Sequence, residues 1–167
     1  IKEVYLGQDF TTVLKTDGTI KCWGESGFYN RCDVPWELVE LKQIDEADRR
    51  RHSIHKFAEK VSVDPNGFGG AALTSDGILM HWGTMRWKDS SKCEEWMTCM
   101  DFSKVRDIKA GDWHIVFLLD DGTIQQFSHP ASDTTDVPED INEVCEIAVG
   151  HEFTVALLKN RIVRSWG

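Results

Sequence analysis

Histidine and cysteine are the residue types that most often carry catalysis or bind metals, so their spacing is the first observation. His52 and His55 stand three residues apart in a segment of helical spacing, which would suit a metal ion. No third ligand lies near this pair in the sequence, and the other four histidines are scattered. We therefore expect no metal site.

The chain has five cysteines, namely Cys22, Cys32, Cys93, Cys99 and Cys145. An odd number without a close Cys-x-x-Cys pair indicates neither a zinc site nor a disulfide framework. We expect all five to be reduced thiols, as in a cytoplasmic or nuclear protein.

Sequence motifs for covalent chemistry are absent. The sequence holds no Gly-rich phosphate loop ending in Lys-Ser/Thr, no Gly-x-Ser-x-Gly elbow and no His-Glu-x-x-His pair. His114 is interpreted as a hydrogen-bonded structural histidine, because Phe10 and Phe153 occupy its place in the related segments described below. We predict that the protein is not an enzyme and that it needs no cofactor.

Charge and hydropathy argue against two classes of partner. The net charge of −9 is unsuited to nucleic acid, which is held by lysine and arginine. The basic run Arg49-Arg50-Arg51 is neutralised locally by acidic residues at 45, 46 and 48. No apolar run approaches the roughly 20 residues that cross a bilayer. We expect neither a nucleic-acid partner nor a membrane partner.

Four segments repeat one pattern, and they supply the elements that position any functional side chain. They span residues 4–24, 61–83, 108–128 and 147–167. Asp-Gly pairs begin at positions 17, 76 and 121, and Asn160-Arg161 takes the fourth place. The closing aromatic residues are Trp23, Trp82, Phe127 and Trp166. Both series step by 59, 45 and 39 residues, so the spacing is fixed within a segment and varies only between segments.

Each segment is typical of antiparallel strands. Short β-rich runs flank the Asp-Gly pair, which is a strong hairpin signal because Gly accepts a positive φ without strain. In the fourth segment Asn160 can adopt a left-handed conformation, but Arg161 is a poor turn residue, so this hairpin should be the loosest. A sheet of about three strands cannot bury both faces alone, so copies must pack face to face, as in propeller blades. The in-register aromatic residues, including Trp23, are expected to fill the space between blades.

We predict an all-β fold, a β-propeller built from short antiparallel sheets. Residues 1–167 form a single repeat domain with units at about 1–43, 59–104, 105–143 and 144–167. A charged insertion at 44–60 separates the first two units. Ile54, Phe57 and Ala58 within it, and Val61 directly after it, fall at helical spacing, which favours a short helix on the rim, with a loop as the alternative.

The repeated pattern of β-run, Gly, aromatic or His, β-run, Asp-Gly, β-run and Trp-Gly resembles the repeats of the regulator of chromosome condensation family. The short connectors with Asp-Val-Pro at 33–35 and 136–138 resemble its β-lactamase inhibitory protein II-like branch. The resemblance implies blades of a β-propeller, usually seven. Since four units are fewer than seven, we expect a segment of a larger propeller or a part-ring completed by another chain, with possible self-association.

Two sets of turn residues form the candidate partner-binding surface. One set lies between the first two strands of each unit and the other follows Trp-Gly. Arginine and large aromatic residues are the types that most often anchor protein interfaces. The predicted partner-binding residues are Asp9, Phe28, Tyr29, Arg31, Phe68, Arg86, Trp87, Asp112, Trp113, His151 and Glu152. Asp9, Asp112 and Glu152 make the surface acidic, although short polar residues also favour turns for local reasons.

These observations favour a non-catalytic protein–protein interaction module, an adaptor or an inhibitor. The alternative is a guanine-nucleotide exchange factor for a small GTPase, which the resemblance also implies. The exchange factor would bind its GTPase best in the nucleotide-free state, whereas an adaptor or inhibitor would not.

Overall fold

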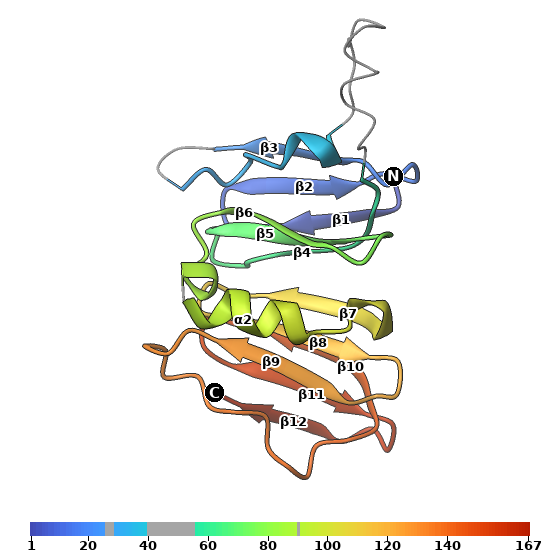
Figure 1. Cartoon of the computed structure of the whole chain (residues 1–167), viewed down its shortest axis with the longest axis vertical. Helices are drawn as coiled ribbons and strands as arrows, with labels where there is room; N and C mark the ends of the chain where they lie inside the picture. Colours follow the sequence, from blue (N-terminus) through green and yellow to red (C-terminus); the bar gives the residue numbers. More distant parts are fainter. Residues whose placement is uncertain (26–28, 40–55, 90) are drawn as a thin grey trace, which may run out of the picture.

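The computed structural model describes residues 1–25, 29–39, 56–89 and 91–167. These residues form four antiparallel three-stranded sheets, each with its strands in sequence order. The sheets stack one after another along the longest axis of the molecule (Figure 1). The predicted all-β fold is confirmed, and each sheet is called a blade below.

The bounds of the strands show that every repeated segment supplies one blade. Blade 1 consists of β1 (Glu3–Leu6), β2 (Phe10–Leu14) and β3 (Ile20–Gly24). Blade 2 consists of β4 (Ala58–Val63), β5 (Gly69–Thr74) and β6 (Leu79–Gly83). Blade 3 consists of β7 (Val105–Ala110), β8 (His114–Leu119) and β9 (Ile124–Ser128). Blade 4 consists of β10 (Val144–Val149), β11 (Thr154–Leu158) and β12 (Val163–Trp166).

The hydrophobic core consists of three layers, one between each pair of successive blades. Leu14 and Ile20 of blade 1 pack with Trp82 of blade 2, and the second layer joins blade 2 to Phe127 and its neighbours in blade 3. Trp166 fills the layer between blades 3 and 4. The prediction for Trp23 is wrong, because its side chain is exposed. Each closing aromatic faces the preceding blade, and none of the described strands lies on that side of blade 1.

The described part of the insertion is strand rather than helix. Residues 40–55, which include Ile54, His52 and His55, lie outside the described residues. Ala58 and Val61 belong to β4, and both side chains are buried. A β-bulge shifts the register between Ala58 and Lys60, so side chains three apart reach the same face of the sheet. The bulge therefore imitates helical spacing, and β7 and β10 carry the same irregularity.

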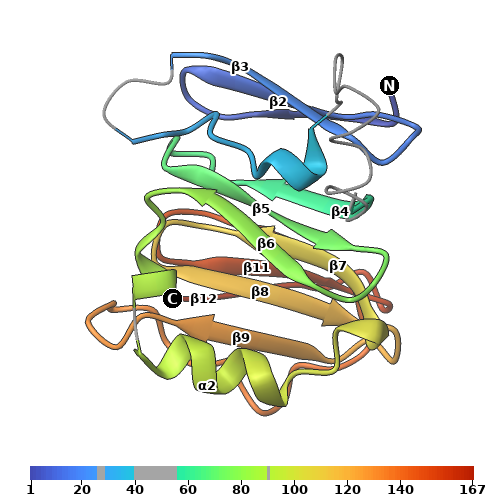
Figure 2. The ribbon, with the colours of Figure 1, turned by 45° about the horizontal axis from the view of Figure 1, so that its top comes forward.

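One helix was not expected from the sequence. Helix α2 (Ser91–Cys99) connects blades 2 and 3 and lies beside β9 (Figure 2). Trp96 packs against the rings of Phe117 and Phe127, at centroid distances of 5.3 and 5.4 Å. Cys93, Trp96, Met97 and Met100 fall at helical spacing and join the core layer between blades 2 and 3. No helix of the described residues is long and apolar enough to span a membrane.

The hairpin turns link neighbouring blades. The amide of Ala58 donates to the carbonyl of Gly18 at 2.8 Å, and the amide of Val144 donates to Gly122 at 2.9 Å. Gly18 and Gly122 have φ of 80° and 84°, which a residue with a Cβ rarely adopts. In blade 4 the left-handed residue is Arg161, at φ 69°, and not Asn160 as expected. Asn160 instead accepts the amide of Ile162 through its side chain.

Candidate protein-binding face

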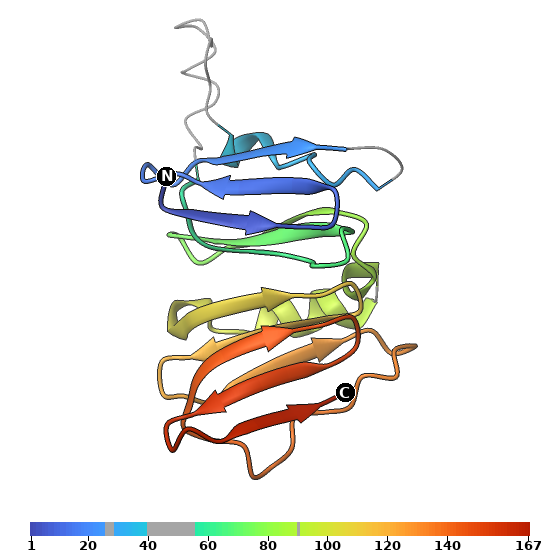
Figure 3. The same ribbon diagram turned by 180° about the vertical axis from the view of Figure 1, so that it is seen from behind.

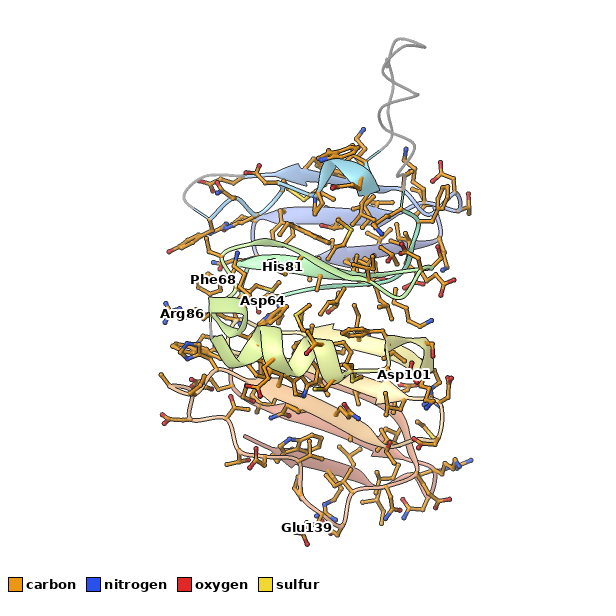
Figure 4. All side chains as sticks on the ribbon, in the orientation of Figure 1. Asp64, Phe68, His81, Arg86, Asp101 and Glu139 are labelled. Carbon is orange, nitrogen blue, oxygen red and sulfur yellow. A yellow bond between two sulfur atoms is a disulfide. The ribbon has the colours of Figure 1, made fainter. Side chains whose placement is uncertain are left out.

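Both sets of predicted turn residues lie at the same end of the blades. The three strands of a blade alternate in direction, so the turn after the first strand and the end of the third strand meet there. We call this the turn end, and the opposite end, which carries the Asp-Gly turns, the hairpin end. Figure 4 shows Phe68 and Arg86 at the turn end and Asp101 at the opposite end.

The first cluster at the turn end joins blades 1 and 2. Arg31 pairs through Nη1 with Oδ2 of Asp9 at 2.9 Å. Its guanidinium carbon lies 5.0 Å from the ring centroid of Tyr29. The Tyr29 ring meets Phe68 edge-on, at a centroid distance of 5.1 Å. The connector after blade 1 therefore reaches the first turn of blade 2 by an aromatic contact.

A disulfide holds the connector that carries Tyr29 and Arg31. Cys22 in β3 is bonded to Cys32, and their Cα atoms are 5.2 Å apart, a normal separation for a disulfide. The expectation of five reduced thiols is therefore corrected. The connector folds back onto β3, and no spacing in the sequence reveals this return. Cys93, Cys99 and Cys145 are outside any disulfide.

The second cluster joins blades 2 and 3. The guanidinium carbon of Arg86 lies 4.5 Å from the ring centroid of Trp113. Arg86 Nε lies 3.5 Å from Oδ2 of Asp112, and the Arg86 amide donates to the Asp112 carbonyl at 2.8 Å. Trp113 meets His129 edge-on, at a centroid distance of 5.6 Å. The connector after blade 2 thus covers the first turn of blade 3.

Two predicted binding residues are buried. The side chain of Trp87 is fully buried between blades 2 and 3, with its ring 5.6 Å from that of His81. The connector turns inward after Gly83, so Trp87 fills the core layer and cannot offer its ring to a partner. Asp112 is also buried, and its carboxylate accepts a hydrogen bond from the backbone amide of Arg86 at 3.2 Å. Both residues support the turn end from beneath.

The other predicted residues are placed as follows. His151 and Glu152 lie in the first turn of blade 4, and the His151 side chain is exposed. Phe28 lies outside the described residues. The strand register makes Asp9, Phe68, Trp113 and Glu152 equivalent positions in successive blades. They form a row along the turn end, acidic at both ends and aromatic in the middle.

Sequence reasoning missed His129 and Asp64. His129 follows β9 as the Arg86 connector follows β6, and that equivalence was the available signal. Asp64 is buried and accepts the amide of Phe68 at 3.1 Å, which fixes the turn that presents Phe68. Burial raises the pKa of the Asp64 carboxyl above its usual range, although the amides of Phe68 and Asn66 act against this shift.

His114 lies between blades 3 and 4 as a structural group. Its Nε2 is 3.1 Å from Oγ1 of Thr154, and its side chain is fully buried. Burial, with a smaller contribution from His151, lowers the pKa of His114 to about 4. Gln126 completes the contact by accepting the indole Nε1–H of Trp166 at 3.0 Å. Within the described ranges no three His, Cys, Asp or Glu side chains are grouped to hold a metal ion.

Comparison with curated proteins finds sequence similarity to HERC2 of two species. No family model matches the chain. The human and mouse E3 ubiquitin-protein ligase HERC2 are each 26% identical to it over 193 residues, covering 98% of this chain but only 4% of HERC2. The chain therefore spans a small part of the curated relatives that it matches.

Solved structures show the same fold. The ectodomain of the receptor kinase ACR4 from Arabidopsis thaliana covers 98% of the chain at a TM-score of 0.64 and 15% identity, with 49% of its own length matched. Prp20p from Saccharomyces cerevisiae covers 99% at a TM-score of 0.57 and 19% identity, with 44% of its length matched. Prp20 is described as yeast RCC1. The resemblance to the regulator of chromosome condensation repeats is confirmed, and the chain is a partial propeller of this type.

Proposed function

We propose that this chain, with its four blades of the regulator of chromosome condensation type, is a non-catalytic protein-binding module that acts as an adaptor or an inhibitor. Its partner binds the turn end. The observation that carries the proposal is the convergence of the two predicted residue sets there, in two clusters that each hold an arginine against an aromatic ring.

The clusters are suited to binding because each holds a partly exposed side chain that is already ordered by its neighbours. Tyr29 is 38% exposed, and the Arg86 side chain is 52% exposed. Each arginine is fixed by a carboxylate and a ring, so less rotamer entropy is lost when a partner binds. Arginine, tyrosine and tryptophan are also the usual anchors of protein interfaces.

The row of Asp9, Phe68, Trp113 and Glu152 suggests the chemistry of the partner. A matching surface carries an apolar centre for the two rings and basic groups at its ends for the two carboxylates. Charge complementarity of this kind raises association rates and orients the partner.

The case against catalysis rests on His114. Its imidazole is held by Thr154 and enclosed between two blades, so it is not available to a substrate. HERC2 is an E3 ubiquitin-protein ligase, but the part similar to this chain is 4% of that protein. A cytoplasmic or nuclear location belongs to the same proposal and rests on the likeness to the regulator of chromosome condensation repeats, because the Cys22–Cys32 disulfide removes the argument from reduced thiols.

A guanine-nucleotide exchange factor is the second candidate. It is supported by the fold of Prp20p, whose structure was described together with its binding to Gsp1p and histones. It needs exposed acidic residues at the turn end, and of the three predicted there Asp112 is buried under Arg86, which leaves Asp9 and Glu152. For this reason we rank the exchange factor second.

Affinity capture with the whole chain as bait tests the first proposal. The variant Tyr29→Ala/Trp113→Ala removes one ring from each cluster, and Phe57→Ala is the matched control, an exposed aromatic at the hairpin end. We expect a protein that is retained by wild type and control and lost from the double variant. With that protein purified, the double variant should bind about 30-fold more weakly or worse. Equal retention by all three baits would refute the proposed face.

The exchange-factor candidate has its own assay. Purified Gsp1p is offered with GDP, with GTP and without nucleotide. Tightest binding without nucleotide, together with faster GDP release, would favour the exchange factor over the adaptor. Equal binding in all three states, or no binding, would exclude the exchange-factor function.

A further inference from the structure

The back face of blade 1, which points away from blade 2, is an uncovered apolar surface. Val4, Leu6 and Trp23 are 55%, 71% and 49% exposed. Residues equivalent to Trp23 are buried in the other blades, namely Trp82 (3%), Phe127 (8%) and Trp166 (7%). The residues equivalent to Val4 are buried too, namely Val61, Ile108 and Ile147. Blade 1 thus presents the half of a blade joint that faces a preceding blade.

The front face of blade 4 presents the other half. Phe153 and Val163 are 50% and 62% exposed. Their counterparts in blade 1 are Phe10 (4%) and Ile20 (1%), and in blade 3 the place of Phe153 is taken by the buried His114. Figure 3 shows blade 4, in red, and blade 1, in blue, at opposite ends of the stack. One molecule therefore cannot bring its own two faces together.

The internal joints show how the two faces would fit. Between blades 1 and 2, Leu14 and Ile20 pack on Val61, Ala72 and Trp82. The equivalent residues are Leu157 and Val163 on blade 4, and Val4 and Trp23 on blade 1, where Val13 lies on the same side of the sheet but is only 4% exposed. A hollow of about 350 Å³ lies on the back face of blade 1, lined by Ile1, Val13 and Trp23 together with Lys15, Thr16, Asp17 and Lys21. A second copy stacked as the internal blades are would place Leu157 and Val163 over the apolar part of this hollow.

The number of blades in a closed propeller indicates which molecule covers the two open faces. The chain matches 49% of the ACR4 ectodomain and 44% of Prp20p, so two copies contain about as many blades as one such propeller. We propose that two copies of this chain close head to tail, with blade 4 of each copy packed on blade 1 of the other. Each joint is heterologous, and a two-fold rotation closes the pair into one ring. This inference does not depend on the proposed function.

The molecular mass of the purified chain in solution, measured by sedimentation, tests the proposed two-copy propeller. Wild type should have twice the monomer mass, and Trp23→Asp and Val163→Asp should each be monomeric, with dimerisation weakened about 30-fold or more. Ile78→Asp is the control, since Ile78 is 44% exposed in a turn at the hairpin end. Both altered side chains are exposed in the single chain, so all variants should keep the far-ultraviolet circular dichroism of wild type.

Mixing the two variants separates this arrangement from a symmetric contact. A mixture of Trp23→Asp and Val163→Asp retains one intact pair of faces, so a heterodimer should form although each variant alone is monomeric. A monomeric wild type would overturn the proposal and leave blades other than those of a second copy as the occupant. A dimer that survives either substitution, or a mixture that stays monomeric, would also overturn it.

Discussion

The guanidinium group of Arg86 lies over the ring of Trp113, with its central carbon 4.5 Å from the ring centroid. The two residues come from the connector after blade 2 and the first turn of blade 3. Tyr29 and Phe68 stand in the same relation one blade earlier, with the connector of one blade covering the turn of the next. The turn end is thus built by contacts between blades, and its geometry depends on their stacking.

Arg86→Ala should lower the free energy of unfolding by about 1 kcal/mol, because it removes the contact with Trp113 and the charged partner of the buried Asp112. Arg86→Lys should recover part of this loss, since it keeps the charge. Urea unfolding monitored by tryptophan fluorescence measures both effects. An unchanged free energy of unfolding in Arg86→Ala would mean that the contacts of Arg86 with Trp113 and Asp112 do not stabilise the fold.

The Cys22–Cys32 disulfide should stabilise the connector that carries Tyr29 and Arg31. Closing a loop of this length is expected to contribute roughly 2–3 kcal/mol, so Cys32→Ser should lower the free energy of unfolding by that amount. Cys99→Ser is the control, because Cys99 is exposed and outside the disulfide. A thiol assay on the denatured, unreduced protein should find three thiols, and five would contradict the disulfide.

His114 should make stability depend on pH. Its pKa falls from 6.5 in the unfolded chain to about 4 in the folded one, so between these values only the unfolded chain binds a proton here. The free energy of unfolding should therefore be unaffected by His114 above pH 6.5. It should fall as the pH drops towards 4, by up to about 3 kcal/mol. Denaturation midpoints across this range measure the fall.

The matched control for this pH dependence is His114→Phe, which copies Phe10 and Phe153 at the same position of blades 1 and 4. The fall attributed to His114 should be absent in this variant. If wild type and variant change in parallel, the pH dependence comes from other groups.

Arg161 holds a left-handed conformation, at φ 69°, where the other hairpins have Gly. Arg161→Gly should raise the free energy of unfolding by about 0.5–1 kcal/mol, because Gly adopts this conformation without strain. The reverse change, Gly122→Ala, should destabilise, since its Cβ would lie 3.3 Å from backbone atoms of Glu143 and Val144. Thermal unfolding of both variants gives the comparison, and a destabilised Arg161→Gly would contradict the account.

The repeat allowed the blades and their turns to be predicted from the sequence, because its two landmarks keep a fixed spacing. Other features could not be predicted, and three of them show why. The bulge in β4 places Ala58 and Val61 on one face and so resembles a helix, while the disulfide depends on how a connector folds back. The burial of Trp87 depends on an inward turn after Gly83. Each is set by contacts between segments, which local patterns do not record.

The candidate site was predicted as two separate sets of turns, and the structure brings them to one end. Composition identified Arg31, Arg86 and Trp113 because these residue types anchor interfaces. It could not separate them from Trp87, which belongs to the same type but lies beneath the surface.

We propose that a protein partner binds the turn end of the blades. The most direct test is hydrogen–deuterium exchange of the whole chain with and without the partner identified by capture. We predict slower exchange in the partner-bound state at residues 7–9, 64–68 and 111–113, with the hairpin-end turns at 15–19, 74–78 and 119–123 unchanged. Protection confined to the hairpin end would contradict the account and place the binding face at the other end of the blades.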